Sequence, residues 1–209
     1  MKKPLLLLLL LISYFQTHAQ RTIPYPIIFV HGWIGSDETW YGMGVMLQSQ
    51  GLNVSLDTDN KRGGQGSRID FHLNADGTRF SSILNRSGGP NYYGDVYDYN
   101  SYINPNNDVF FVNFDNRFSN EPSKLSNEAG VTKQGFAVGL AVKKVLEATG
   151  AKKVILFGHS MGGLAIREYL QNPVNWLMND GNHHVAKLIT SGTPHKGSNS
   201  TFGNLLSLT

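Results

Sequence analysis

One stretch, Lys153-Val154-Ile155-Leu156-Phe157-Gly158-His159-Ser160-Met161-Gly162-Gly163, joins a short apolar run to a turn rich in glycine. Its first half has the continuous hydrophobicity of a strand buried on both faces. After the turn, apolar residues recur at helical spacing as far as Gln171. Asn172-Pro173 then ends the helix, because the residue before a proline avoids the helical region. The stretch therefore predicts a strand, a tight turn and a helix in succession.

The turn carries the pattern Gly-x-Ser-x-Gly, which in a strand–turn–helix setting presents a nucleophilic serine above a sheet. A serine held there needs a strained backbone, at a cost of about 1–3 kcal/mol. Gly158 and Gly162 lack side chains, so strand and helix can approach closely, and His159 completes the motif. The amides that begin the following helix favour a developing negative charge. Ser160 is therefore the predicted nucleophile; the other interpretation is a glycine-rich turn with an inert serine.

Outward from this turn, the chain alternates strand and helix patterns. Apolar runs at 26–30, 107–114 and 185–190 predict three further buried strands. A helix with one apolar face is expected before the central stretch, ending at Gly150 as its C-cap. Such alternation is typical of a parallel sheet with right-handed crossovers. We therefore predict the α/β class, with a mostly parallel sheet and helices on both faces.

Residues 51–106 interrupt this alternation and are rich in Gly, Asn, Asp and Tyr. We expect a long irregular surface insertion, with a hairpin turn at 74–77 between 71–73 and Phe80. The tyrosines of 91–102 either line a binding surface or lie on the core. Asp57, Asp59 and Asn60 suggest a calcium loop only weakly, because Arg62 stands where such a loop needs glycine. No metal and no cofactor are therefore expected.

A second motif follows the first predicted strand, where His31-Gly32-Trp33 opens a glycine-containing loop. An acyl-transfer enzyme needs at least two donors aimed at the oxyanion. The backbone amide of Met161, directly after the serine, is one candidate. The amide of Trp33 is the other, although the loop is also compatible with an ordinary strand-ending turn. Nearby side chains either form an apolar acyl pocket or lie in the core, namely Trp33, Trp40, Tyr41, Met43 and Met46.

A third motif, Ser191-Gly192-Thr193-Pro194-His195-Lys196-Gly197-Ser198, follows the last predicted strand. With these three motifs in this order, the chain resembles the α/β-hydrolases, and among them the secreted bacterial triacylglycerol lipases. The resemblance covers about residues 25–50 and 107–200 and fits poorly over 51–106. It implies that Ser160 is the nucleophile, that Trp33 and Met161 give the oxyanion amides, and that the first strand corresponds to the family's third.

The family places an acid and then a histidine after the serine in chain order. Only fifteen residues follow Pro194; they contain no Asp or Glu, and their sole histidine is His195. His195 lies in the turn motif, and His183 and His184 are expected at the far end of their strand. Asp115 ends the second strand but precedes the serine. We therefore expect the chain to stop short of the acid–base pair, with C-terminal strands and helices missing and a hydrophobic sheet edge exposed.

The N-terminal segment has the three parts of a secretory signal: Lys2 and Lys3, an apolar run over 5–12, and small residues at Thr17 and Ala19. We predict a signal peptide at 1–19, a hydrolase domain at 20–209, and a secreted or periplasmic protein. The 209 residues carry a formal charge of +3, or +1 without the two signal lysines, which gives no case for nucleic-acid binding. The chain has no cysteine, which excludes disulfides, thiolate metal sites and a cysteine nucleophile.

Two classes of function agree with these observations. The first is a secreted serine ester hydrolase that acts through an acyl-enzyme on an ester or lipid, with possible contact to a lipid surface and no membrane-spanning segment once the signal is removed. The second is an incomplete or degenerate hydrolase fold that serves as a non-catalytic binding module. A serine is nearly inert unless a base takes its proton, so reactivity of Ser160 separates the two classes.

Overall fold

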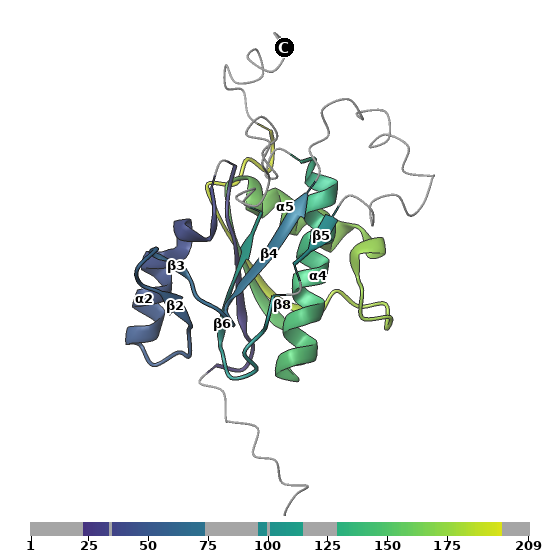
Figure 1. Ribbon diagram of the computed structural model, residues 1–209. Helices are drawn as coiled ribbons and strands as arrows, with labels where there is room; N and C mark the ends of the chain where they lie inside the picture. Colours follow the sequence, from purple (N-terminus) through teal and green to yellow (C-terminus); the bar gives the residue numbers. More distant parts are fainter. Residues whose placement is uncertain (1–22, 34, 74–95, 100, 115–128, 198–209) are drawn as a thin grey trace, which may run out of the picture.

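The computed structural model describes residues 23–33, 35–73, 96–99, 101–114 and 129–197. The predicted signal peptide, Asp115 and the predicted turn at 74–77 lie outside these residues. Across the described part, the chain forms a central sheet with helices packed against both of its faces (Figure 1).

The central sheet has six strands in the order β5-β4-β6-β1-β7-β8. Five of them run parallel, and β5 pairs antiparallel with β4 at one edge. The α/β class and the mostly parallel sheet are therefore confirmed. The strand bounds are β1 Ile27–Val30, β4 Arg68–Leu73, β5 Val96–Asp98, β6 Val109–Asn113, β7 Val154–His159 and β8 Val185–Ser191.

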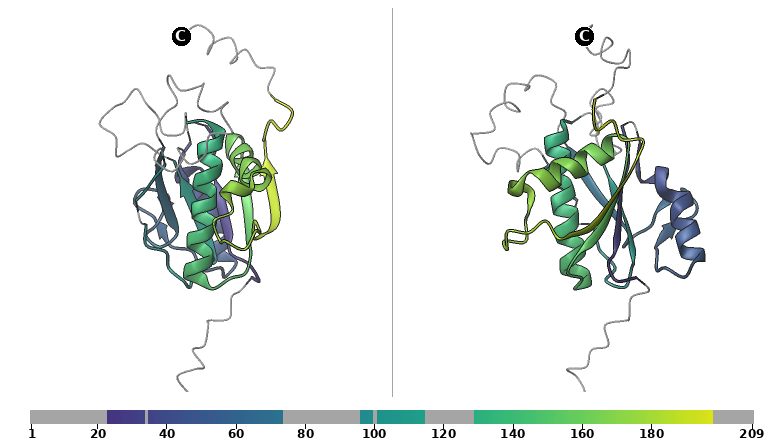
Figure 2. Two further views of the ribbon diagram at one scale, coloured as in Figure 1. Left: turned by 90° about the vertical axis from the view of Figure 1, so that its right-hand side faces the viewer. Right: turned by 180° about the vertical axis from the view of Figure 1, so that it is seen from behind.

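The two faces of the sheet are covered by different elements (Figure 2). One face packs against α4 (Val131–Thr149) and α5 (Met161–Gln171), and η4 (Pro173–Asn175) follows α5. The other face packs against η1 (Asp37–Trp40) and α2 (Tyr41–Ser49), beside the small hairpin of β2 (Leu56–Asp57) and β3 (Arg62–Gly63). The prediction of helices on both faces is confirmed.

Local sequence signals set the ends of the two long helices. Gly150 caps α4 in the left-handed conformation at φ 67°, and its N–H donates to the carbonyl of Leu146. Asn172 takes an extended conformation before Pro173 and ends α5. The helix face of α4 predicted from its periodicity is buried against the sheet: Val138, Ala141, Val142, Val145 and Leu146.

Alternate side chains of the strands form two separate hydrophobic clusters. Ile28, Phe110 and Val112 face α4 and α5, whereas Phe29 and Phe111 face η1 and α2. Parallel strands that are covered on both faces are apolar along their whole length. This continuous hydrophobicity is what allowed these strands to be predicted from the sequence.

The expectation that 51–106 is an irregular insertion is wrong for part of that segment. β4 lies inside the sheet between β5 and β6, paired in parallel with β6. Its apolar residues Ile69, Phe71 and Leu73 face the core, and polar residues alternate with them. On its other side β4 pairs antiparallel with β5, with Phe71 opposite Asp98, while Phe80 lies outside the described residues.

At the opposite edge, β8 is the outermost strand of the described sheet, and its side chains are largely exposed. Leu188 and Ile189 are 36% and 39% exposed, although they point to opposite faces of the strand. Within the described residues, none of the helices combines the length and hydrophobicity needed to cross a bilayer.

Candidate active site

Ser160 lies at the junction of β7 and α5 with φ 50° and ψ −122°. This is the left-handed half of backbone space, where a residue with a side chain is strained. Two backbone hydrogen bonds hold the conformation: the N–H of Ser160 donates to the carbonyl of Ser191 at 2.9 Å, and the N–H of Gly163 donates to the carbonyl of Ser160 at 3.1 Å. The predicted strand, turn and helix are present, and the serine occupies the turn.

The glycines around Ser160 allow close contacts between backbones. A Cβ on Gly158 would lie 2.6 Å from the Cα of Gly163. A Cβ on Gly162 would overlap the carbonyl oxygens of Val30 and His31 at the end of β1. The turn therefore brings the start of α5 directly against the first strand, and only glycine fits at these positions.

The loop after β1 lies beside the serine. A Cβ on Gly32 would lie 2.9 Å from the Cβ of Ser160 and 3.1 Å from Nδ1 of His159. The N–H of Gly35 donates to the carbonyl of Gly32 at 3.1 Å and closes a tight turn. The structure thus brings together the loop that carries Trp33 and the turn that carries Met161, two segments more than a hundred residues apart in the chain.

His31 is fully buried and holds this loop in place. Its Nε2 accepts a hydrogen bond from the backbone N–H of Phe114 at 2.9 Å. The ring proton is therefore on Nδ1, which donates to the carbonyl of Gly32 at 2.8 Å. With both nitrogens engaged, His31 acts as a neutral positioning residue that joins β1, the loop and the end of β6.

A row of polar side chains crosses the sheet at this level. Asp70 pairs in register with Asn113, and Val30 pairs with both Val112 and Gly158, so His31 and His159 continue the same row. Asn113 Nδ2 donates to Asp70 Oδ1 at 2.7 Å, and Arg68 Nε donates to Asp70 Oδ2 at 2.8 Å. No motif in the sequence predicted this row of side chains. Its only local signal is the period-two alternation of polar and apolar residues in β4.

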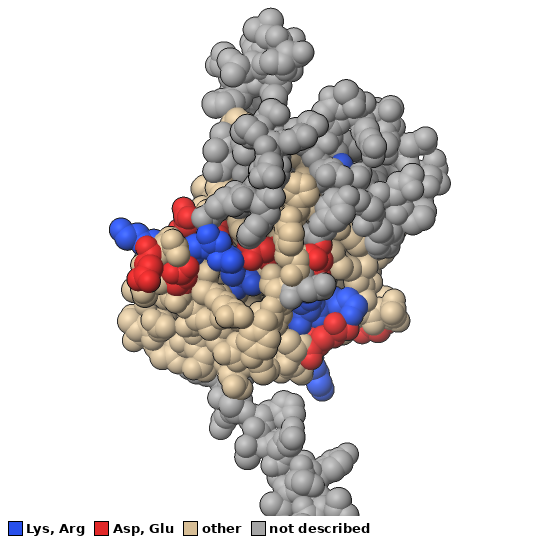
Figure 3. All heavy atoms as spheres, in the orientation of Figure 1, with Lys and Arg blue, Asp and Glu red and all other residues tan. Residues whose placement is uncertain are grey.

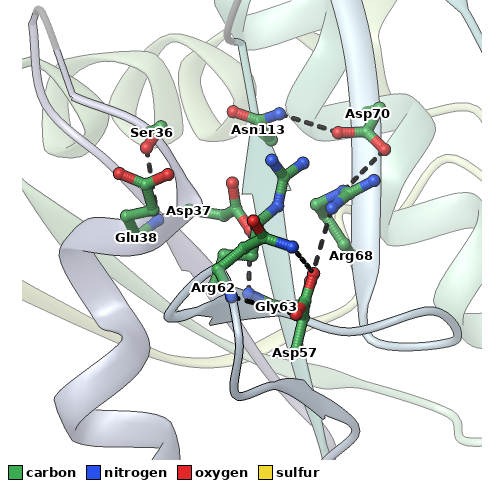
Figure 4. A network of polar contacts seen from close by, with 10 residues as sticks. Ser36, Asp37, Glu38, Asp57, Arg62, Gly63, Arg68, Asp70 and Asn113 are labelled. Atoms are coloured by element: carbon green, nitrogen blue, oxygen red, sulfur yellow. Dashed lines mark hydrogen bonds and ion pairs between the residues drawn. The ribbon is translucent and has the colours of Figure 1, made fainter.

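Asp37, at the start of η1, ties the loop after β1 to the β2–β3 hairpin (Figure 4). Its carboxylate is completely buried, and Oδ2 accepts a hydrogen bond from the N–H of Gly63 at 2.8 Å. Arg62 Nε lies 3.8 Å from the same oxygen. Burial raises the pKa of Asp37, and the Arg62 guanidinium opposes that shift. On the face of the molecule seen in Figure 3, basic side chains (Lys and Arg) lie close to acidic ones (Asp and Glu).

We expect Asp37→Ala to lower the free energy of unfolding by about 3–5 kcal/mol, because removing one partner of a buried ion pair leaves the other charge uncompensated. Glu38→Ala is the matched control, since Glu38 is the exposed neighbour in the same turn. Urea denaturation of both variants measures the difference. Equal losses in the two variants would contradict the role given to Asp37.

The described histidines are distributed over both ends of the sheet. His159 stands at the serine, with its ring edge-on to Trp40 at 6.2 Å. His195 is exposed, and its Nε2 lies 3.2 Å from Oγ1 of Thr190. His183 and His184 precede β8 at the other end, where the N–H of Val154 donates to the carbonyl of His184. Among the described residues, no hydrogen bond joins a histidine to the hydroxyl of Ser160.

The side chains considered as an apolar acyl pocket near the loop after β1 lie in different environments. Trp40 is buried against Phe29 and Phe111 beneath α2, and Met43 packs against the same cluster. Trp33 and Met46 are instead 41% and 47% exposed. The core interpretation therefore holds for Trp40 and Met43.

Asp57 also has a local structural role. It accepts hydrogen bonds from the backbone N–H and the side-chain amide of Asn60, at 3.1 and 2.8 Å. These bonds lower the pKa of Asp57. No group of three metal-ligating side chains occurs in the described part of the chain.

Part of this chain is similar in sequence to known bacterial proteins. Two curated bacterial proteins, each called triacylglycerol lipase, are 42% identical over 76 residues, which is 36% of this chain. They come from Pseudarthrobacter phenanthrenivorans and Burkholderia plantarii, and the match spans 21% and 19% of their respective lengths, about a fifth.

Two solved structures are also similar over most of this chain. The product of the gene lin2722 from Listeria innocua has a TM-score of 0.46 and 15% identity, over 82% of this chain and 52% of its own. The lipase BlEst2 from Bacillus licheniformis, in its propeptide form, has a TM-score of 0.41 and 20% identity, over 83% of this chain and 23% of its own.

The family comparison covers nearly all of the described fold. The model of the PGAP1-like alpha/beta domain matches residues 23–208, from just before β1 to beyond β8. The chain therefore belongs to the PGAP1-like alpha/beta domain family, within the α/β-hydrolase superfamily.

Proposed function

We propose that this protein is a secreted serine ester hydrolase of the lipase or esterase type, with Ser160 as its nucleophile. The observation that carries the proposal is the strained backbone of Ser160, at φ 50°, between a parallel strand and a helix with Gly32 packed against it. Strain of this kind persists only where the surrounding structure over-determines it, and it is concentrated at functional sites. The triacylglycerol lipases that match over 76 residues support an ester or lipid substrate.

The proposed chemistry has two steps. The Oγ of Ser160 attacks the ester carbonyl, the C–O bond to the alcohol breaks, and the serine proton leaves with the alcohol. Water then attacks the acyl-enzyme, which releases the carboxylic acid and returns the proton to the serine. In both steps the amides of Met161 and Trp33 stabilise the oxyanion, and removing one such donor commonly costs 10²–10³-fold in rate. The histidine–acid pair that moves the proton is expected from outside the described residues.

Export is part of the same proposal. Positive charge, an apolar run and small residues at 1–19 indicate a secretory signal. An exported lipase meets aggregated substrate at a lipid surface, and the exposed Trp33, which follows Gly32 in the loop next to the serine, is a side chain suited to that contact.

A fluorophosphonate probe tests the proposal, because it labels a serine only when a base activates it. We expect the purified protein to be labelled at Ser160, as identified by peptide mass spectrometry, and to hydrolyse a p-nitrophenyl ester. Pretreatment with the probe is expected to abolish that hydrolysis.

One observation favours the second candidate, a non-catalytic binding module: in the described residues no histidine is bonded to the Ser160 hydroxyl. A folded protein that resists the probe and hydrolyses no ester would favour that candidate and overturn the first. Circular dichroism and a cooperative thermal transition establish that the protein tested is folded.

A further inference from the structure

A pocket lies at the amino ends of β7 and β8, at the opposite end of the sheet from Ser160. Its walls come from the end of α4, the turn before β7, the segment after η4 and the start of β8. Its volume is about 600 Å³. Volumes of roughly 300–1,000 Å³ are typical of sites that bind small molecules. The pocket is lined by Leu146, Ala151, Lys152, Lys153, Met178, Asn182, His183, His184 and Val185.

The inner wall of the pocket is apolar. Leu146 and Val185 are buried members of the large hydrophobic cluster, and Ala151 and Met178 pack against that cluster. An aliphatic chain placed on this wall would gain about 0.8 kcal/mol for each methylene group that it buries. The wall therefore favours a ligand with a hydrocarbon part.

The rim of the pocket is cationic, and its lining contains no acidic residue. Lys152 and Lys153 are exposed, and neither ammonium group forms an ion pair within the described residues. His183 does not add charge in this geometry, because its Nδ1 accepts a hydrogen bond from the N–H of Val185 at 2.9 Å. The rim therefore suits an anion that both lysines can reach.

His184 forms a pair with Asp180 beside this rim. Both of its ring nitrogens face acceptors: Nδ1 lies 2.9 Å from the carbonyl of Lys152, and Nε2 lies 2.8 Å from Oδ2 of Asp180. Desolvation lowers the pKa of His184, but the bonds to Lys152 and Asp180 outweigh that effect and raise it. Asp180 lies outside the lining and pairs with His184, and within the described residues it forms no ion pair with Lys152 or Lys153.

We propose that this pocket binds the carboxylate of a medium- or long-chain aliphatic acid, with the head group at Lys152 and Lys153 and the chain on the wall formed by Leu146 and Val185. A charge-assisted hydrogen bond to a lysine is stronger than a neutral one and fixes the head group. The same acid would be the product of the proposed ester hydrolysis, so the pocket would hold product away from the serine. The binding itself does not depend on catalysis.

Isothermal titration calorimetry with decanoate, below its micelle-forming concentration, tests the proposal on the Ser160→Ala protein. That background removes turnover, so failure to bind and failure to hydrolyse esters are separate results. We expect decanoate to bind at one site, with acetate and decylammonium bound at least about tenfold more weakly, a difference that corresponds to about 1.4 kcal/mol. Acetate lacks the chain, and decylammonium reverses the charge.

A pair of matched double variants locates the site. Lys152→Gln with Lys153→Gln is expected to weaken decanoate binding at least about tenfold. Lys187→Gln with Lys196→Gln removes the same charge from exposed lysines outside the pocket and is expected to leave binding within about twofold. Thermal unfolding checks that both proteins are folded. Equal binding by the two double variants, equal binding of decylammonium, or no decanoate binding would each overturn the proposal.

Discussion

Ser160→Ala is expected to lower kcat for ester hydrolysis by about 10⁶-fold, the loss seen when a related serine hydrolase loses its nucleophile. The reason is chemical: alanine has no oxygen to form the acyl-enzyme, so only the oxyanion amides and substrate binding remain. KM is expected to change little, because the hydroxyl adds little to binding of the uncharged ester. Steady-state hydrolysis of a p-nitrophenyl ester, with labelling by a fluorophosphonate probe, measures both effects.

Ser49→Ala is the matched control for this experiment. Ser49 is exposed at the end of α2, and its hydroxyl donates only to the carbonyl of Met46. We expect its kcat and its labelling to equal those of the unchanged protein. If Ser160→Ala retained more than about a thousandth of the activity, hydrolysis would have to use another nucleophile and the proposed mechanism would be wrong.

Gly162→Ala is expected to destabilise the fold by about 3 kcal/mol or more, at the upper end of the cost of overpacking. A Cβ on Gly162 would overlap the carbonyl oxygens of Val30 and His31, and both belong to a central strand and its adjoining loop. Backbone in that position cannot move without displacing the loop beside Ser160. We therefore expect a loss of activity together with the loss of stability.

The chain offers a matched control, because Gly42 is also the second residue of its helix. A Cβ on Gly42 would meet no atom within 4 Å. Gly42→Ala is therefore expected to be neutral or to stabilise the protein by up to about 1 kcal/mol, since alanine has the higher helix propensity. Urea unfolding compares the two variants. Similar unfolding midpoints would show that α5 does not pack against β1 as closely as described.

Local sequence patterns located the parts of the fold whose environment is uniform along the chain. β1 and β6 are largely buried on both faces, and β7 is buried on one face and partly buried on the other, so each has an unbroken apolar run in the sequence. α4 and α5 have one buried face and clear ends at Gly150 and Asn172. The turn at Ser160 was predictable for the same reason, because its glycines and its strained serine are consecutive in the chain.

β4 was missed because it meets two different environments. Ile69, Phe71 and Leu73 face a hydrophobic core, whereas Arg68 and Asp70 face the polar network next to β6 and β3. In a segment rich in glycine, asparagine and aspartate, this alternation was too short to stand out from loop sequence.

The sequence by itself determined the α/β class, the place of Ser160 and the glycines that let two backbones meet there, because these depend on residues close together in the chain. Only the tertiary structure showed that His31 is a neutral link between β1 and β6, that Asp37 holds the loop through Gly63, and that Lys152 and Lys153 border an apolar pocket. Hydrogen bonds and pockets of this kind join segments distant in sequence, so no local pattern encodes them. The proton on His31 and the burial of Asp37 follow from which backbone groups the fold brings within hydrogen-bond distance.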